Sequence, residues 1–274
     1  YGYKLDTTPN IGKFAREGVL FSQAINQGSK THVSLPSIHT STYARTHGIY
    51  NKGYRLNPLL KTLARTLKDN HYTTAGIQYS TRYIPELKQG FDYIFDDPDA
   101  NKADVITQKA VSWLEKNYRK RFFLWLHYFD THAPYNPPMP YKQMFIKGAN
   151  LNRRHIRLGD SLFDSYRAIP LYAAEGNITD VDYYIGKYDG AIRFVDEEIG
   201  IVLRKIEELH LADNTIVVIT ADHGELLGEH ELYFVHWTLY DENIRVPLLI
   251  KCKGFIPHAR AITQQVQSID IAPT

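Results

Sequence analysis

Apolar and polar positions follow two periods along this chain, one typical of buried strands and the other of amphipathic helices. Short apolar runs with few charges predict strands at 19–25, 72–78, 121–128, 214–220 and 246–251. Apolar residues that recur every three or four positions predict helices from Asn10 to just before Gly18 and at 58–70, 104–118 and 183–209. Strands that alternate with helices favour an α/β fold, with a mostly parallel central sheet and helices on both of its faces.

Residues 137–180 do not follow this alternation. The stretch is rich in Tyr, Arg and Pro and has no clean period. A functional lid is one interpretation, and a surface excursion without function is the commoner one. We therefore expect a single catalytic domain over residues 1–274, with an insertion or lid at about 137–180.

Composition narrows the possible partners. The 274 residues carry a formal net charge of +2, which predicts no nucleic-acid partner and no binding to an anionic membrane. The single cysteine, Cys252, excludes an internal disulfide. No apolar run approaches the ~20 residues of a membrane span, and no signal peptide is visible, so the sequence leaves the cellular compartment open between cytoplasmic and periplasmic or extracellular.

The segment Ala221-Asp222-His223-Gly224-Glu225 directly follows the predicted strand at 214–220. Asp222 and His223 would stand at the carboxyl end of that strand, where open α/β sheets bind their ligands. Carboxylate and imidazole groups are also metal ligands. An N-capping Asp followed by a turn Gly explains the segment about as well when it is taken alone.

Several further segments occur in the order in which the sulfatase family of the alkaline-phosphatase superfamily has them. The chain resembles that family at 8–21, at Ser34-Leu35-Pro36-Ser37, and at 129–135, 188–197, 219–250 and 268–274. The resemblance covers nearly the whole chain. It implies a metal-dependent hydrolase of sulfate or phosphate esters, acting on a small-molecule or glycan ester. It also implies a fragment, which lacks a first strand with metal-binding aspartates and a C-terminal subdomain.

The resemblance assigns the nucleophile and the metal ligands. Ser34 falls at the nucleophile position, and Pro36 suits the first turn of a helix that begins there. Asp222 and His223 match two ligands of a divalent ion, and the oxygen of Ser34 contacts it as well. The family favours calcium, with manganese, zinc and magnesium as alternatives. A cation ~4 Å from a developing alkoxide contributes about 4 kcal/mol at an effective dielectric of ~20, against about 1 kcal/mol for a neutral hydrogen bond, so metal activation is the stronger mechanism.

Three other residues receive roles from the same resemblance. His132 would serve as general acid to the leaving group or as a donor to a substrate oxygen. His236 stands where many members have a lysine and would bind the anionic group. Arg45 would stabilise the nucleophile helix and lend charge to the site. A hydrogen-bonded structural residue is the alternative for each histidine.

One departure from the family bears on the chemistry. Sulfatases convert a Cys or Ser to formylglycine within a motif that ends in Arg two residues after the Pro, and here that position is Ile38. We therefore expect Ser34 to stay unmodified and formylglycine to be absent, which favours phosphoesters or phosphonoesters. Two other functions stay open: a phosphotransferase that acts on a lipid or glycan, and a non-catalytic module that binds anionic glycans through His236 and Arg45.

Overall fold

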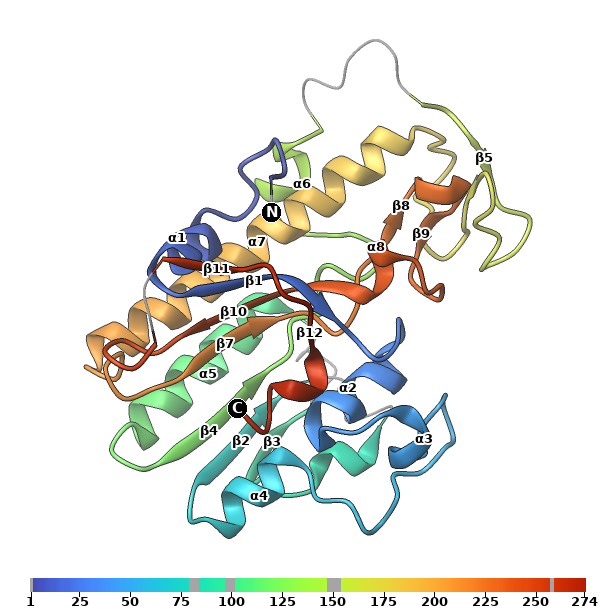
Figure 1. Ribbon diagram of the computed structural model, residues 1–274. Helices are drawn as coiled ribbons and strands as arrows, with labels where there is room; N and C mark the ends of the chain where they lie inside the picture. The colour runs from blue at the N-terminus through green and yellow to red at the C-terminus, as the bar shows by residue number, and fades with distance from the viewer. Residues whose placement is uncertain (1, 79–83, 97–101, 147–153, 257–258) are drawn as a thin grey trace.

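The strands of the core form two sheets that lie side by side (Figure 1). The computed structural model describes residues 2–78, 84–96, 102–146, 154–256 and 259–274. The first sheet has the order β11 (Arg260–Ile262), β1 (Val19–Ile25), β10 (Arg245–Lys251) and β7 (Val217–Thr220), with β12 (Val266–Gln267) also beside β1. The second has the order β3 (Tyr93–Phe95), β2 (Thr73–Ile77) and β4 (Phe122–Leu126). Within these two sheets only β10 runs against its neighbours; the other paired strands are parallel.

Helices cover these sheets, which confirms the predicted α/β fold. The longer ones are α1 (Pro9–Glu17), α2 (Thr31–Thr40), α4 (Leu63–Asp69), α5 (Ala103–Asn117) and α7 (Val181–Glu208). Single turns form α3 (Ala44–His47), α6 (Tyr141–Met144) and α8 (Asp241–Ile244). Within the described ranges, no helix combines the length and the apolar character that crossing a membrane requires.

A cavity of about 1810 Å³ lies between β4 and β7 and reaches Asp222 and His223. In the described part of the chain β4 pairs only with β2 and β7 only with β10, so each strand has one edge without a neighbour. Side chains of α7 also line this space, among them Ile192, Ile199 and Leu203. These residues are only half-buried because they face the cavity.

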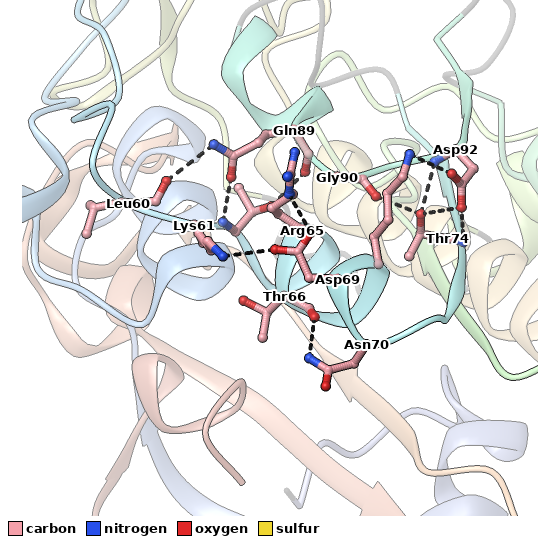
Figure 2. Close-up of polar contacts among 12 residues, drawn as sticks. Leu60, Lys61, Arg65, Thr66, Asp69, Asn70, Thr74, Gln89, Gly90 and Asp92 are labelled. Carbon is pink, nitrogen blue, oxygen red and sulfur yellow. Dashed lines mark hydrogen bonds and ion pairs between the residues drawn. The ribbon is translucent and has the colours of Figure 1, made fainter.

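Helix α4 begins at Leu63, five residues after the predicted start at 58. Thr62 caps it by accepting a hydrogen bond from the backbone of Arg65 at 3.1 Å. The cap is fixed from outside the helix, because Gln89 accepts from the backbone of Thr62 at 2.7 Å and donates to Leu60 (Figure 2). The start of α4 therefore depends on Gln89, which lies 27 residues after Thr62 in the sequence. The local pattern of leucines contains no sign of this contact and predicted a start that is too early.

The stretch at 137–180 packs onto the rest of the protein. It contains α6 and the short strands β5 (Arg157–Leu158) and β6 (Ala168–Ile169), while residues 147–153 lie outside the described ranges. Ile169 and Ala173 are buried in a cluster with Phe234, which belongs to β9 (Tyr233–Val235). Strand β9 pairs with β8 (Leu226–Leu227), four residues after Asp222, so the stretch is built against the segment that carries the Asp-His pair.

Candidate active site

Helix α2 determines which hydroxyl group reaches the Asp-His pair. It begins at Thr31, one turn before the predicted start, and Pro36 lies inside it. The proline ring has no N–H and is usually tolerated only in a first turn. That preference led the sequence analysis to begin the helix at Ser34. The helix therefore presents a different residue at its N-terminus from the one predicted.

Ser34 forms its hydrogen bond within its own helix turn and not with the Asp-His pair. Its Oγ donates to the backbone oxygen of Lys30 at 3.0 Å, and the residue has no exposed surface. Ile38, at the position where the modification motif has Arg, is buried in an apolar cluster with Leu35. Among the contacts of the described residues, none joins Ser34 to Asp222 or His223. Ser34 as the nucleophile stays a prediction, and the structure adds that its side chain is buried and hydrogen-bonded to the backbone of its own helix.

Thr31 is the hydroxyl residue that meets the pair. Its Oγ1 lies 3.2 Å from Nε2 of His223. The other ring nitrogen of His223, Nδ1, lies 3.0 Å from the backbone oxygen of Gly224. A carbonyl only accepts, so Nδ1–H of His223 donates to Gly224. Nε2 faces both the hydroxyl of Thr31 and Oδ2 of Asp222, which lies 3.5 Å away. Thr31 was not among the predicted site residues, because its place at the start of the helix is visible only in the structure.

Asp222 is a buried carboxylate at the end of β7. Asn26 fixes its backbone by donating to the main-chain oxygens of Ala221 and Asp222, at 3.1 and 2.5 Å. Burial raises the pKa of the Asp222 carboxyl, but His223 and His127 outweigh that effect and hold the pKa well below its usual range. The described residues give Oδ2 of Asp222 no hydrogen bond, although the atom is buried. Its nearest charged neighbour is Nε2 of His223, 3.5 Å away, so this anionic oxygen has room for a cation as a further partner.

His127, at the end of β4, faces the same carboxylate and was not among the predicted site residues. Its Nε2 lies 3.9 Å from Oδ1 of Asp222, across the boundary between the two sheets. Its Nδ1 is buried without a partner among the described residues. Only the arrangement of the two strands brings this histidine to Asp222, because the residues are 95 positions apart in the sequence.

Three imidazole rings lie in contact beside the pair. The ring of His236 stacks on that of His223 with centroids 4.2 Å apart, and it meets the ring of His132 at 5.1 Å. Burial lowers the pKa of both His132 and His236. The structure therefore brings four of the six predicted residues together: Asp222, His223, His132 and His236.

Glu225 lies beneath these rings and was also missed. Its Oε2 is 3.4 Å from Nδ1 of His236, and its side chain is only 5 % exposed. Burial raises the pKa of Glu225 to about 7, although His132 and His223 oppose the shift. The sequence does not predict a role for Glu225, because Gly-Glu is also a common pair in exposed surface loops.

The positive charge near the site comes from the side chain of Lys30, whereas the predicted Arg45 has no contact with the site among the described residues. Arg45 is exposed on α3, and no contact with the other candidate residues is found for it in the described ranges. The ammonium group of Lys30, at the N-cap of α2, lowers the pKa of His236 and of His32, which places its positive charge near both rings. The positive end of the helix lies in the same region, because Thr31, its first residue, contacts His223, and no side chain caps this end.

The donors present fit part of a divalent-metal site. Asp222 supplies an unsatisfied carboxylate oxygen, His223 an imidazole lone pair and Thr31 a hydroxyl oxygen. Within the described ranges, however, no group of three or more His, Cys, Asp or Glu side chains is arranged to hold a metal ion. A complete site would need further donors.

The whole chain, residues 1–274, matches the Sulfatase family. It belongs to the sulfatase family. A curated relative, the ulvan-active sulfatase of Formosa agariphila (strain DSM 15362 / KCTC 12365 / LMG 23005 / KMM 3901 / M-2Alg 35-1), is 28% identical over 97% of this chain. The match covers 56% of that relative, so the sequence spans little more than half of its length.

Solved structures agree with this assignment at the level of the fold. BT4656, in complex with its substrate D-glucosamine-2-N,6-O-disulfate, has a TM-score of 0.80 at 21% identity, over 97% of this chain and 70% of its own. The phosphonate monoester hydrolase of Agrobacterium radiobacter has a TM-score of 0.78 at 18% identity, over 97% and 68%. Sulfatases and phosphonate hydrolases thus share the fold of this member of the family.

Proposed function

We propose that this sulfatase-family protein hydrolyses sulfate or phosphate esters with the hydroxyl of Thr31 as its nucleophile. The observation that carries the proposal is the 3.2 Å contact between Thr31 Oγ1 and His223 Nε2, beside the buried carboxylate of Asp222. The ulvan-active sulfatase supports sulfate esters and the phosphonate monoester hydrolase supports phosphorus esters. Oxidation at Cβ of a threonine would give a ketone, so the nucleophile acts without formylglycine.

The side chains around Thr31 divide the reaction between them. The Thr31 oxygen forms a bond to the phosphorus or sulfur atom as the hydroxyl proton passes to water and the bond to the leaving oxygen breaks. Nδ1 of His132 donates to the backbone oxygen of Ala133 at 2.6 Å, and in the protonated ring the second N–H, at Nε2, supplies the proton that the leaving oxygen receives. His236 and the charge of Lys30 stabilise the non-bridging oxygens. Water then cleaves the ester formed on Thr31 and regenerates the hydroxyl group.

Asp222 and His223 would hold a divalent ion. When bound, the ion would supply positive charge that lowers the pKa of the Thr31 hydroxyl. Oγ1 of Thr31 lies 3.2 Å from Nε2 of His223, so the hydroxyl group would lie beside that positive charge.

The cavity between β4 and β7 indicates where the further ligands of this ion would enter. An additional strand in that space would pair with both free edges and bury Ile216 and Val218, which are 64% and 37% exposed. Its carboxyl end, if parallel to its neighbours, would lie beside Asp222 and His127. We include such a strand, ending in carboxylates, in the proposed metal site.

Asp222→Asn tests the proposed function directly. Rates are measured on an aryl sulfate, a phosphate monoester and a phosphonate monoester, with a panel of divalent ions and with an alcohol as competing acceptor. We expect about one bound ion in the wild type, and its loss with a rate fall of about 10²–10³-fold in the variant. Asp213→Asn is the matched control, since Asp213 is an exposed aspartate that pairs with Lys253. Equal rates and equal ion content in both variants contradict the assignment, and transfer to the alcohol indicates a phosphotransferase.

A further inference from the structure

Glu225 is a buried carboxyl group that the proposed reaction does not use. It lies in the turn between β7 and β8, and its side chain is only 5 % exposed. Its one ion-pair contact in the described part of the chain is with His236, where Oε2 lies 3.4 Å from Nδ1. A carboxyl group that is buried without a lysine or arginine partner costs free energy of folding. A role in the site is a reason to keep such a group.

Tyrosine side chains form another part of its surroundings. Three hydroxyl groups have pKa values that are raised first by burial and then by the charge of this carboxyl, those of Tyr135, Tyr172 and Tyr188. Tyr172 donates to the backbone oxygen of Phe234, and the ring of Tyr135 meets the ring of Phe234 at 6.0 Å. These contacts fix the wall against which the carboxyl group lies.

The contact with Glu225 selects one orientation of the His236 ring. A half turn about the Cβ–Cγ bond exchanges each ring nitrogen with a carbon atom, so only one of the two orientations places Nδ1 against the carboxyl group. The ring also stacks on that of His223, with centroids 4.2 Å apart and planes 20° apart. A half turn leaves a stacked ring stacked. The hydrogen bond to Glu225 therefore distinguishes the two orientations, whereas stacking does not.

The second nitrogen of the His236 ring, Nε2, is left for the substrate. It has no hydrogen bond among the described residues, and it is not one of the buried polar atoms that lack a partner, so it is open to a ligand. When the ring carries both N–H groups, Glu225 accepts from Nδ1 and an anionic oxygen accepts from Nε2. The ring orientation that suits Glu225 thus also determines where Nε2 meets the anion.

We propose that Glu225 is a positioning residue, which holds the His236 ring so that Nε2 meets the non-bridging oxygens of the ester. This inference rests on the proposed function, because there His236 binds those oxygens. In this role Glu225 acts through His236 alone and touches neither the substrate nor the ion. Any effect of Glu225 on anion binding must therefore disappear when His236 is absent.

Binding of inorganic phosphate tests this role without requiring turnover. Its dissociation constant is measured by calorimetry at one fixed concentration of divalent ion. Glu225→Leu removes the acceptor, and we expect the affinity to fall about 3- to 10-fold, the loss typical of one hydrogen bond. Glu225→Gln keeps an oxygen acceptor for Nδ1–H and should bind phosphate at least about as well as the wild type. Charge alone predicts the opposite for Glu225→Leu, because removal of a negative charge favours a nearby anion.

A double-mutant cycle shows whether the effect passes through His236. In His236→Ala, the further change Glu225→Leu should leave the phosphate affinity unchanged, whereas a general structural effect would persist. The ring nitrogen resonances of His236, assigned by their loss in His236→Ala, should show a protonated Nδ1 in the wild type and in Glu225→Gln. A mixture of tautomers is expected in Glu225→Leu. Glu208→Leu is the matched control, since Glu208 is an exposed glutamate that pairs with Lys205.

Three results overturn the inference: equal phosphate affinity in the wild type and Glu225→Leu, an Nδ1 of His236 that carries no proton in the wild type, and a wild type that binds no phosphate. The tautomer of His236 in the wild type remains decisive if Glu225→Leu does not fold. Failure of the proposed function shows itself differently, as an absence of ester hydrolysis while phosphate binding still depends on Glu225 and His236.

Discussion

Thr31→Ala and Ser34→Ala form a pair that separates the two candidate nucleophiles. Both residues carry a hydroxyl, and they lie one turn apart on the same helix. Thr31 reaches His223, whereas Ser34 donates to the backbone of Lys30 and is fully buried. The variants should therefore differ in kind: one affects the chemistry and the other affects stability.

The structure gives the size of each effect. Ser34→Ala removes one hydrogen bond, worth about 1 kcal/mol, and places a better helix former in α2. We expect a Tm decrease of about 2–4 °C at most and rates within about twofold of the wild type. Thr31→Ala removes the attacking oxygen, for which we expect a rate loss of about 10³-fold or more with little change in Tm. Thr31→Ser, which restores a hydroxyl, should recover most of that loss.

The assay combines initial rates of ester hydrolysis with thermal unfolding of each variant. A slow substrate quenched at an early time should also leave the transferred group on the peptide that contains both residues, and fragmentation of that peptide assigns the group to Thr31 or Ser34. If Ser34→Ala abolishes hydrolysis at an unchanged Tm while Thr31→Ala stays active, the reasoning from the Thr31–His223 contact is refuted. The original prediction of Ser34 would then stand.

Two further predictions concern stability. Burial raises the pKa of Asp189 to about 6, although the hydroxyl of Tyr3 donates to it at 2.8 Å and opposes the shift. The stability that the protonated Asp189 carboxyl contributes is therefore fully present below about pH 3.8. It is lost as the pH rises through about 6, by up to about 3 kcal/mol. Between pH 4 and pH 8, Asp189→Asn should therefore lose less of its free energy of unfolding than the wild type does. At Gly224 a Cβ would lie 1.9 Å from the backbone oxygen of Glu242. Gly224→Ala should therefore lower the free energy of unfolding by about 1–3 kcal/mol or more. The control is Gly12→Ala in α1, where a Cβ has ordinary contacts, and it should not lower the free energy of unfolding.

Elements with a long, regular pattern could be predicted from the sequence. Strand β1 has the predicted bounds, and helix α7 lies within two residues of its predicted start and one of its predicted end. Apolar periodicity over many residues outweighs local irregularity in such segments. The Asp-His pair was identifiable for a related reason, since a strand followed by polar residues marks the edge of a sheet where ligands bind.

Helix starts were less predictable, because contacts far away in the sequence set them. The start of α4 depends on Gln89, and α2 tolerates Pro36 in its interior. The earlier start of α2 places Thr31, one helical turn before Ser34, at the N-terminus of the helix. A serine inside a familiar motif drew the assignment, whereas the local cue for Thr31, an uncapped helix N-terminus, becomes visible only in the structure.

The division of the core into two sheets explains why the remaining site residues escaped sequence analysis. Strand β7 ends at Thr220, just before Asp222, and β4 ends at Leu126, just before His127. Parallel strands bring their carboxyl ends to one edge, so each strand delivers a polar residue to the same place even though the two strands are not paired. The sequence predicts that each strand ends in polar residues, but not which strand ends are neighbours. Asp222 thus acquires its neighbour His127 from the arrangement of the sheets, a contact that neither strand predicts by itself.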